Sequence, residues 1–567
     1  MLWRGSASFS HTPQSCGVSG FQPYELSLSG ISNEGGHLLH VPAEYCGSPA
    51  FRAPCATIVA TKRAATLATA GLPLAANNPH SAQWGFREHI ETRLFINGEF
   101  VESSDGRTFD ITNPATLKLV AKVHEASEQD TDRAVASAKA AFPSWSALSP
   151  QERAPYFRKL ANLIRENNDE LAALEAAAMG KPIGTFFDGY ASAGKFEHYA
   201  ESGYAVQGTT SVQTPGFLNM VLRQPYGVVA AIIPWNVPLL FLANKVAPAL
   251  IVGNTVVVKS SEKAPLTSAK LATLVKQAGF PPGVFNIITG FGNVSGSILS
   301  HHMDVRALSF TGSGRTGRMI QAASAKSNLK QVYLELGGKS PAVVFEDADL
   351  EKAVKETAYS IQSNSGQVCM ANSRIYIQDT IADKYLDLFK DYFTTKVTVG
   401  DPLEKGTNHG PQADEVQHKT VLRYLEMGKQ SGDLVIGGSA PSDREGYYIQ
   451  PTIFTNTPED ATIMKEEVFG PVVNINVFKT EEEVLAKANN TEYGLYAAVY
   501  TKDINRAIRF AKGLEAGTVG VNCTSPTTGV NDTPFGGYKS SGSGREGEPF
   551  YSLNNFLETK SVIIKLD

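Results

Sequence analysis

The stretch Gly227-Val228-Val229-Ala230-Ala231-Ile232-Ile233 decides the fold class, because it is almost continuously apolar and ends at Pro234. A run of this kind, without alternating polar residues, is typical of a strand that is buried on both faces of a parallel sheet. Helical and apolar segments then alternate along the chain, at residues 239–250, 254–259, 267–278, 284–288 and 307–310. This alternation predicts an α/β fold with an open, mostly parallel, doubly wound sheet, which binds its ligands at the carboxyl ends of its strands.

Upstream of this sheet, three segments have clear local patterns. Residues 94–101 predict a hairpin around Asn97-Gly98, a dipeptide that favours tight turns. Apolar residues at three- and four-residue spacing predict helices near residues 131–141 and 150–179.

Composition excludes several classes of protein. With 567 residues, 42% of them hydrophobic and 19% charged, the chain is long enough for two or three globular domains. Its 56 acidic and 51 basic side chains give a net charge of −5, and there is no long basic run. We therefore expect no nucleic acid partner. No apolar stretch approaches the length of a spanning helix, so we also expect no membrane span.

The five cysteines, Cys16, Cys46, Cys55, Cys369 and Cys523, form no CxxC or Cys/His pattern. We expect neither a disulfide framework nor a metal site from this arrangement. A reducing compartment fits such cysteine usage, and the expected location is the cytoplasm.

Residues 1–90 differ from the rest, being rich in Ser, Gly, Pro, Ala and His. One interpretation is a mitochondrial presequence, because basic residues such as Arg52 and Lys62 outnumber the nearby acids in places. Acidic residues such as Glu25 and Glu34 weaken that interpretation. A disordered extension, or a misassigned start of the chain, is the interpretation we favour.

A thiol and a carboxylate stand in two distinctive segments, LELGGKSP at residues 334–341 and GQVCMANSR at residues 366–374. The nucleophilic thiolate would be Cys369 and the base that activates water would be Glu335, which together suffice for acyl chemistry at sulfur. The glycine pair after Glu335 would let its carboxylate swing. Taken alone, Cys369 fits a buried structural thiol, and Glu335 fits an ion pair with Lys339 or with a neighbouring domain.

Asn236 lies in Pro234-Trp235-Asn236-Val237-Pro238, directly after the first strand. Its amide could donate a hydrogen bond to an oxyanion that forms near Cys369. The alternative is an Asn that caps the next helix, but the Pro-Trp-Asn-x-Pro setting favours the oxyanion role.

Two further strand ends predict a dinucleotide site. Lys259 can reach a phosphate or a ribose hydroxyl, and Glu262 could accept from both hydroxyls of an adenosine ribose. Glu262 would repel a 2′-phosphate, which favours NAD over NADP, although NADP stays possible. A solvated charge pair is the alternative for these two residues. The turn Phe310–Gly317 (FTGSGRTG) could hold a pyrophosphate at a helix N-terminus, although it is not a GxGxxG fingerprint.

Three residues farther along complete the candidate set. Glu467 could bind the nicotinamide ribose while Phe469 packs on the ring, although ordinary core packing of Phe469 is the alternative. Glu546, in a turn-rich loop, could relay protons from the active site to solvent or could simply stabilise the loop.

Residues 92–564 resemble the NAD(P)-dependent aldehyde dehydrogenase superfamily in the order and spacing of these motifs, and most closely its hydrolytic, non-acylating branch. The resemblance implies that Cys369 attacks the aldehyde, that Glu335 activates the deacylating water, that Asn236 holds the oxyanion and that Glu546 assists. It also implies a cofactor site, with no metal, at Trp235, Lys259, Glu262, Gly312, Ser313, Gly314, Arg315, Thr316, Gly317, Leu336, Glu467 and Phe469.

The resemblance further implies a domain order. We expect a Rossmann-like NAD-binding domain over residues 91–336 with an oligomerisation hairpin near 207–223. A catalytic domain would follow over 337–540, and a C-terminal segment over 541–567 would pair with the hairpin. A homodimer or homotetramer is expected. Pro549 departs from the family pattern, because it would break a helix at that point.

The expected reaction is NAD-dependent oxidation of an aldehyde to the carboxylic acid through a thioester on Cys369. The alternatives are an acylating dehydrogenase that uses coenzyme A, a catalytically retired relative, and a protein that only senses NAD. Val368, Met370 and the loop at residues 524–531 suggest a pocket for a medium-sized or apolar aldehyde.

Overall fold

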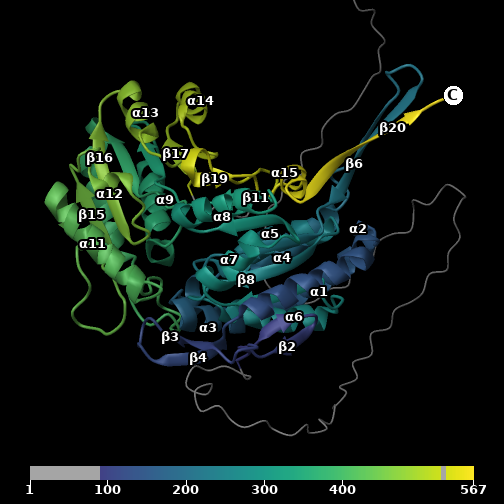
Figure 1. Cartoon of the computed structure of the whole chain (residues 1–567). Helices are drawn as coiled ribbons and strands as arrows, with labels where there is room; N and C mark the ends of the chain where they lie inside the picture. Colours follow the sequence, from purple (N-terminus) through teal and green to yellow (C-terminus); the bar gives the residue numbers. More distant parts are fainter. Residues whose placement is uncertain (1–89, 525–530) are drawn as a thin grey trace, which may run out of the picture. The chain divides into compact units, whose positions relative to one another are not determined.

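The computed structural model describes residues 90–524 and 531–567, which belong to one unit of the chain, Leu74–Asp567. The interpretations of residues 1–89, and those of the loop at residues 525–530, lie outside the described residues. Two large sheets organise the described part, and Figure 1 shows helices covering both of them.

The first sheet has eight strands in the order β19-β11-β10-β7-β8-β9-β1-β2. Its five central strands are parallel, as predicted: β7 (Val228–Ile232), β8 (Thr255–Ser260), β9 (Phe285–Thr289), β10 (Val305–Thr311) and β11 (Gln331–Glu335). Its edges are the antiparallel strands β1 (Leu94–Ile96), β2 (Glu99–Val101) and β19 (Gly542–Ser543).

The apolar run that decides the fold class is buried on both faces. Val229 and Ala231 of β7 pack into one hydrophobic core, and Val228, Ala230 and Ile232 pack into a second core on the opposite face. Burial on both faces explains why this strand has no alternating polar residues.

Helices flank this sheet at α1 (Glu128–Ser146), α2 (Pro150–Glu166), α3 (Asn168–Met179), α4 (Asp188–Ser202), α5 (Pro238–Ile251), α6 (Leu266–Ala278), α7 (Ser297–His301) and α8 (Gly314–Lys326). The single helix predicted over residues 150–179 is two helices in the structure. Asn167 leaves the helical conformation with φ −104° and ψ 13°, and its side chain donates to the Leu163 carbonyl. A short amide side chain that bonds its own backbone commonly ends a helix in this way.

The predicted hairpin is confirmed. Ile96 pairs with Glu99, and the turn residues Asn97 and Gly98 have φ of 55° and 78°. Two successive positive φ values define the turn type that Asn-Gly favours. A separate antiparallel pair, β3 (Thr108–Thr112) and β4 (Leu119–His124), follows it.

The second sheet has the order β14-β15-β16-β13-β12-β17-β18, and only β14 is antiparallel. Its strands are β12 (Pro341–Val344), β13 (Arg374–Gln378), β14 (Asp433–Ile436), β15 (Thr452–Thr455), β16 (Val472–Phe478), β17 (Tyr496–Tyr500) and β18 (Thr518–Val521). Its helices are α9 (Leu350–Gln362), α10 (Ala382–Thr395), α11 (Glu415–Ser431), α12 (Thr462–Lys465), α13 (Glu481–Asn489) and α14 (Ile504–Gly513). The predicted domain boundary at residue 337 falls in the link between β11 and β12.

A three-stranded sheet joins distant parts of the sequence. β6 (Phe217–Pro225) lies between β5 (Thr209–Ser211) and β20 (Leu557–Lys565), and Figure 1 shows β6 and β20 side by side. The predicted pairing of the 207–223 region with the C-terminal strand is therefore present.

The expectation that Pro549 breaks a helix is wrong. A short helix, α15 (Pro549–Asn554), begins at this proline, and the Glu548 side chain accepts from the Tyr551 N–H. Proline suits the first position of a helix because its missing N–H has no partner there in any case.

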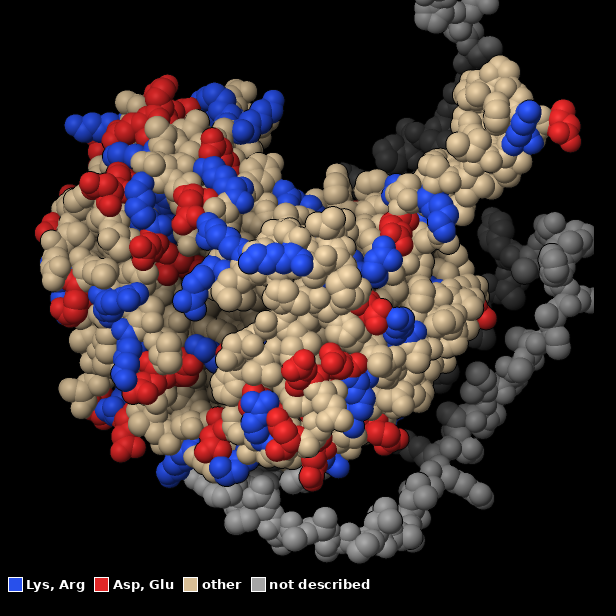
Figure 2. Space-filling view, in the orientation of Figure 1, with Lys and Arg blue, Asp and Glu red and all other residues tan. Residues whose placement is uncertain are grey.

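Lys and Arg are interspersed with Asp and Glu over the face seen in Figure 2. Across residues 90–524 and 531–567, no helix is long and apolar enough to cross a membrane. The same residues contain no group of three His, Cys, Asp or Glu side chains that could hold a metal ion.

Candidate active site

The loop that carries Cys369 is built from an unusual backbone. Asn364, Ser365 and Gly366 follow α9 with φ values of 49°, 53° and 74°. At Gly366 an added Cβ would lie 2.1 Å from the Gly470 backbone, so only glycine fits there. The Gln367 amide fixes the loop by donating to the Asn364 carbonyl and accepting from the Ala413 N–H. These contacts set the position of Cys369 two residues later.

The Cys369 thiol lies against a carboxyl group. Burial raises its pKa well above the ordinary value, and the negative charges of Glu335 and Glu467 raise it further. The thiol and the Glu335 carboxyl group shift each other's pKa, so the structure brings the two predicted catalytic groups together.

Glu335 is the last residue of β11 and is only 3% exposed. Burial raises its pKa to about 8, and the nearby Glu546 adds to this effect, while Lys245 opposes it. Neither oxygen of Glu335 has a hydrogen-bond partner within the described part of the chain. A carboxyl group with a pKa near the working pH is suited to general base catalysis.

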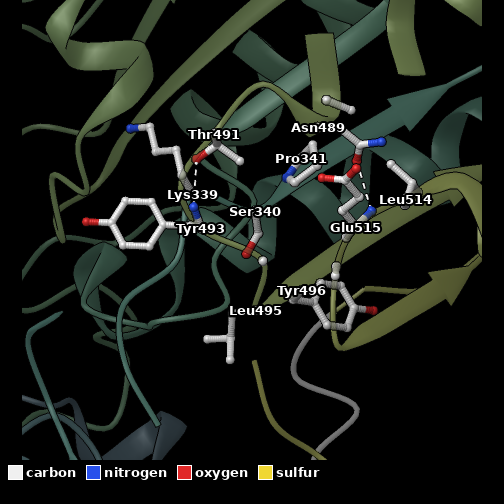
Figure 3. Close-up of a pocket in the computed structure, with 14 residues that line it drawn as sticks. Lys339, Ser340, Pro341, Asn489, Thr491, Tyr493, Leu495, Tyr496, Leu514 and Glu515 are labelled. Atoms are coloured by element: carbon white, nitrogen blue, oxygen red, sulfur yellow. Dashed lines mark hydrogen bonds between the residues drawn. The ribbon is translucent and has the colours of Figure 1, made fainter. Parts of the chain in front are cut away.

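The alternative ion pair between Glu335 and Lys339 is not formed. Lys339 lines a separate small pocket beside Thr491 and Tyr493 (Figure 3). Its Nζ atom has no partner among residues 90–524 and 531–567, and burial lowers its pKa to about 7.

The glycine pair after Glu335 makes room for its neighbours. A Cβ on Gly337 would lie 2.2 Å from a Glu467 carboxylate oxygen, and one on Gly338 would lie 2.4 Å from the Cys369 carbonyl oxygen. The Gly338 N–H donates to Glu467 over 2.9 Å. These close approaches require glycine at both positions.

Asn236 belongs to the loop of the nucleophile. Its Nδ2 atom donates to the Gln367 carbonyl over 2.9 Å, and its own carbonyl accepts from Asn364. The helix that follows is capped at Val237 without any side-chain bond, so Asn236 is not a helix cap. One N–H of its amide is left over after the bond to Gln367.

Glu546 makes two kinds of contact. Its backbone exchanges hydrogen bonds with Phe535, which anchors the loop, and its carboxylate lies 2.6 Å from the Lys245 Nζ. Sequence reasoning missed Lys245, which is completely buried on α5. The signal that could have found it is a single charged residue in a helix whose only other polar residue is Asn244.

The residues predicted for the cofactor lie at strand and helix ends. Lys259 and Glu262 form a charge pair at 3.2 Å, but the pair is not the solvated one of the alternative interpretation, because Lys259 is buried while Glu262 is partly exposed. Burial lowers the pKa of Lys259. Ser313 caps α8, and Gly317 brings the helix against Leu336, because a Cβ there would lie 2.8 Å from Leu336 Cδ2. The remaining residues of this turn are Gly312, Gly314, Arg315 and Thr316.

Two of the residues expected to bind the cofactor, Trp235 and Phe469, contact each other. The rings of Trp235 and Phe469 lie edge to face with centroids 5.3 Å apart. Burial raises the pKa of Glu467 to about 7. A glycine-lined helix start, a charge pair at a strand end and a buried carboxyl beside aromatic rings together fit a dinucleotide.

A cavity of about 650 Å³ opens next to Cys369. Its apolar lining includes Phe187, Val237, Leu240, Phe241, Val368 and Met370. Lys181 also contacts this cavity, and its ammonium is held by Glu175 at 2.6 Å and by Asp188.

Within this two-sheet α/β fold, a thiol lies near a buried carboxyl group, and the residues expected to bind a dinucleotide lie at strand and helix ends. The family model described as the aldehyde dehydrogenase family matches residues 100–562. The chain belongs to that family, which confirms the predicted fold class and the predicted enzyme class, an aldehyde-oxidising dehydrogenase with a nicotinamide cofactor.

Individual relatives are similar to this chain over almost their whole lengths. An aldehyde dehydrogenase of Davidiella tassiana is 46% identical over 492 residues, which is 86% of this chain and 97% of the relative. Aldehyde dehydrogenase, cytosolic 1, of Macroscelides proboscideus is 43% identical and covers 84% of this chain and 95% of its own length. Among solved structures, the P. syringae indole-3-acetaldehyde dehydrogenase in complex with NAD+ has a TM-score of 0.83 at 39% identity, with 86% of this chain and 99% of that chain covered.

Proposed function

We propose that Cys369 and Glu335 carry the oxidation of an aldehyde to its carboxylic acid. The observation that supports this most directly is that the Cys369 thiol, which lines an apolar cavity, interacts with the buried Glu335 carboxyl group. Covalent capture by sulfur divides one difficult step into two easier ones.

In the first half of the reaction, the Cys369 thiol gives its proton to the Glu335 carboxylate, which passes it on to solvent, and the thiolate adds to the aldehyde carbonyl and forms a hemithioacetal. The left-over amide N–H of Asn236 and the backbone N–H of Cys369 stabilise the oxyanion. Bound NAD supplies the hydride acceptor, so that a thioester remains on Cys369. Glu467 and the Trp235–Phe469 pair would hold the nicotinamide end in place.

In the second half, Glu335 removes a proton from a water molecule that attacks the thioester. The bond from water oxygen to carbon forms, the carbon–sulfur bond breaks, and the acid leaves Cys369 free as a thiolate. Glu335 then has to lose the proton it has gained. Glu546 would receive that proton, because its charge acts on Glu335 and its carboxylate is held by Lys245.

NAD is the proposed cofactor in preference to NADP. Glu262 presents a partly exposed carboxylate beside Lys259, where the adenosine ribose would lie. A 2′-phosphate would be repelled by that carboxylate. The helix start at residues 312–317 would hold the pyrophosphate, and Leu336 would pack beneath it.

The substrate would be an uncharged, largely apolar aldehyde. The cavity wall is mainly aliphatic and aromatic, and its one cation, Lys181, is already bound by two acids. Burial raises the pKa of Glu175 well above its ordinary value, so that the cluster of Lys181, Glu175 and Asp188 carries no net charge when Glu175 is protonated. A charged substrate end would find no partner there.

A homo-oligomer in the cytoplasm is the proposed form of the protein. The sheet of β5, β6 and β20 carries exposed apolar side chains, of which Ile563 is 70% exposed. Apolar residues at a sheet edge favour contact with a second chain. The name of the Macroscelides proboscideus relative, which is described as cytosolic, supports the compartment.

The test follows NADH formation by purified protein on a panel of apolar, carboxylated and amino aldehydes. We expect turnover by the parent protein, none by Cys369→Ala, and normal turnover by Cys523→Ala. Cys523 is the matched control, because it is the other described cysteine and is also partly exposed. Activity that survives in Cys369→Ala would rule out the covalent mechanism.

A further inference from the structure

Lys195 is a buried lysine on α4 that takes no part in either half of the proposed reaction. The residue is 6% exposed, and its Nζ atom lies 2.5 Å from the Asn531 side-chain oxygen. The same Nζ lies 3.9 Å from the point where a Cβ on Gly547 would be. Lys195 therefore reaches the loop that carries Glu546, and it interacts electrostatically with Glu546 itself.

We propose that Lys195 is a positioning residue for thioester hydrolysis, whose ammonium group balances the charge of Glu546 while that carboxylate receives the proton released by Glu335. This inference rests on the proposed function, because it concerns the second half of the same reaction. The step moves one proton from water to Glu335, then to Glu546, and then to solvent, and no electrons are transferred.

Buried atoms without hydrogen-bond partners mark the route of the proton from Glu335 to Glu546. Both oxygens of Glu335 and the Oε2 atom of Glu546 are buried without a hydrogen-bond partner in the described ranges 90–524 and 531–567. Buried polar atoms of this kind are usually satisfied by ordered water. A water between the two carboxyl groups would give the proton a path, with the other Glu546 oxygen held by Lys245.

Charge counting explains why a second lysine is useful. Glu335 and Glu546 together carry two negative charges when both are ionised, and Lys245 supplies only one positive charge in contact. With Lys195 included, these four groups carry two charges of each sign, so loss of the proton from Glu335 leaves no net charge among them. Burial lowers the pKa of Lys195, and the charge of Glu546 opposes that effect.

The other titratable groups around Lys195 do not replace it. His198 lies one helical turn away, and its pKa is lowered by burial and by Lys195, which favours the neutral form. Burial raises the pKa of Tyr199, whose hydroxyl contacts the Gly547 carbonyl and Ser552. Glu548 acts on His198 and Tyr199 and adds negative charge to this corner.

The experiment compares Lys195→Met with Lys195→Arg in the full chain. Lys159→Met is the control, because Lys159 is an exposed lysine on the neighbouring helix α2. Rapid mixing with NAD and an aldehyde measures the initial burst of NADH, which reports thioester formation, and the steady-state rate, which reports hydrolysis. Thermal melting and NAD binding verify that each variant is folded.

In Lys195→Met we expect an unchanged burst and a steady-state rate about tenfold lower near neutral pH, with the acid limb of kcat displaced to higher pH. Lys195→Arg should have the steady-state rate and the pH profile of the parent, and so should Lys159→Met. An unaltered rate and pH profile in folded Lys195→Met would overturn the inference. A higher KM confined to carboxylated aldehydes, with the pH profile unmoved, would also overturn it and would make Lys195 a substrate-binding group. A parent that shows no burst would instead overturn the proposed function.

Discussion

The pKa of Glu335, raised to about 8 mainly by burial, determines the pH at which the base is available. The carboxylate, which is the form that accepts a proton from water, predominates above that value and is lost as the pH falls below it. We expect the steady-state rate to rise with pH and to level off above about 8, with close to a tenfold loss per pH unit on the acid side. A rate profile that is flat from pH 6 to 9, while hydrolysis limits turnover, would contradict this.

Replacing Glu335 with Gln should separate the two halves of the reaction. The amide keeps the shape of the side chain but cannot take a proton from water, so the thioester should accumulate. We expect a steady-state rate about 10²- to 10⁴-fold lower. Mass spectrometry of the quenched enzyme should detect the acyl adduct on Cys369. Glu102→Gln, at an exposed glutamate after β2, is the control and should leave the rate unchanged.

His409 is a buried neutral side chain that affects stability rather than catalysis. Burial lowers its pKa to about 4, against an ordinary value of 6.5. The unfolded chain therefore binds a proton below pH 6.5 that the folded chain does not bind. The free energy of unfolding should fall as the pH drops from about 6.5 to about 4, by up to about 3 kcal/mol from this group.

The measurement for His409 is urea unfolding at pH 7.5 and at pH 5. We expect His409→Asn to be less stable than the parent at pH 7.5, because the Ile449 carbonyl loses the ring nitrogen beside it. The difference between the two proteins should shrink at pH 5. A constant difference at both pH values would show that His409 does not titrate on unfolding.

At the scale of the elements, the turn between α9 and Cys369 depends on two properties of Gly366. Its φ of 74° strains any other residue, and a Cβ would meet the Gly470 backbone at 2.1 Å. Gly106 has nearly the same φ, 73°, with nothing within 4 Å of its missing Cβ. The pair of substitutions to Ala therefore separates backbone strain from steric contact.

We expect Gly106→Ala to cost about 1 kcal/mol of stability and to keep full activity. Gly366→Ala should cost clearly more and should abolish turnover, because the loop must shift and Cys369 moves with it. Denaturant unfolding and NADH formation measure the two effects. Equal losses of stability and activity at the two positions would mean that the contact with Gly470 is relieved without moving the loop.

The sequence predicted elements well where the signal is local. The parallel strands around β7 and the Asn97-Gly98 hairpin carry their own patterns of burial and turn chemistry, and both are present. The break at Asn167 was missed because apolar spacing continues across it. Pro549 was misjudged because a proline that ends one helix can equally begin another, and only the bond from Tyr551 to Glu548 distinguishes the two cases.

At the scale of the whole molecule, the site residues that the sequence indicated differ from those it missed in how far away their partners lie in sequence. Cys369 and Glu335 stand in segments whose composition already indicates their chemistry. Lys245 does not, because it meets Glu546 across 301 positions of sequence. Lys195 likewise meets Asn531 across 336 positions. Contacts of this range follow from the packing of α4 and α5 against the C-terminal loop, which no local pattern records.

We expect assembly of the protein to depend on the free edge of β20. β20 pairs with β6 along nine residues, and its other edge has no strand partner in the described part of the chain. Exposed apolar side chains on this strand would be covered by a second copy, since such an edge is otherwise a site of uncontrolled association. We expect Ile563→Glu to dissociate the oligomer, and Lys560→Glu, at an exposed polar position of the same strand, to leave it intact. Light scattering coupled to size exclusion measures the molar mass, and a parent that elutes as a monomer would disprove this assignment of the strand.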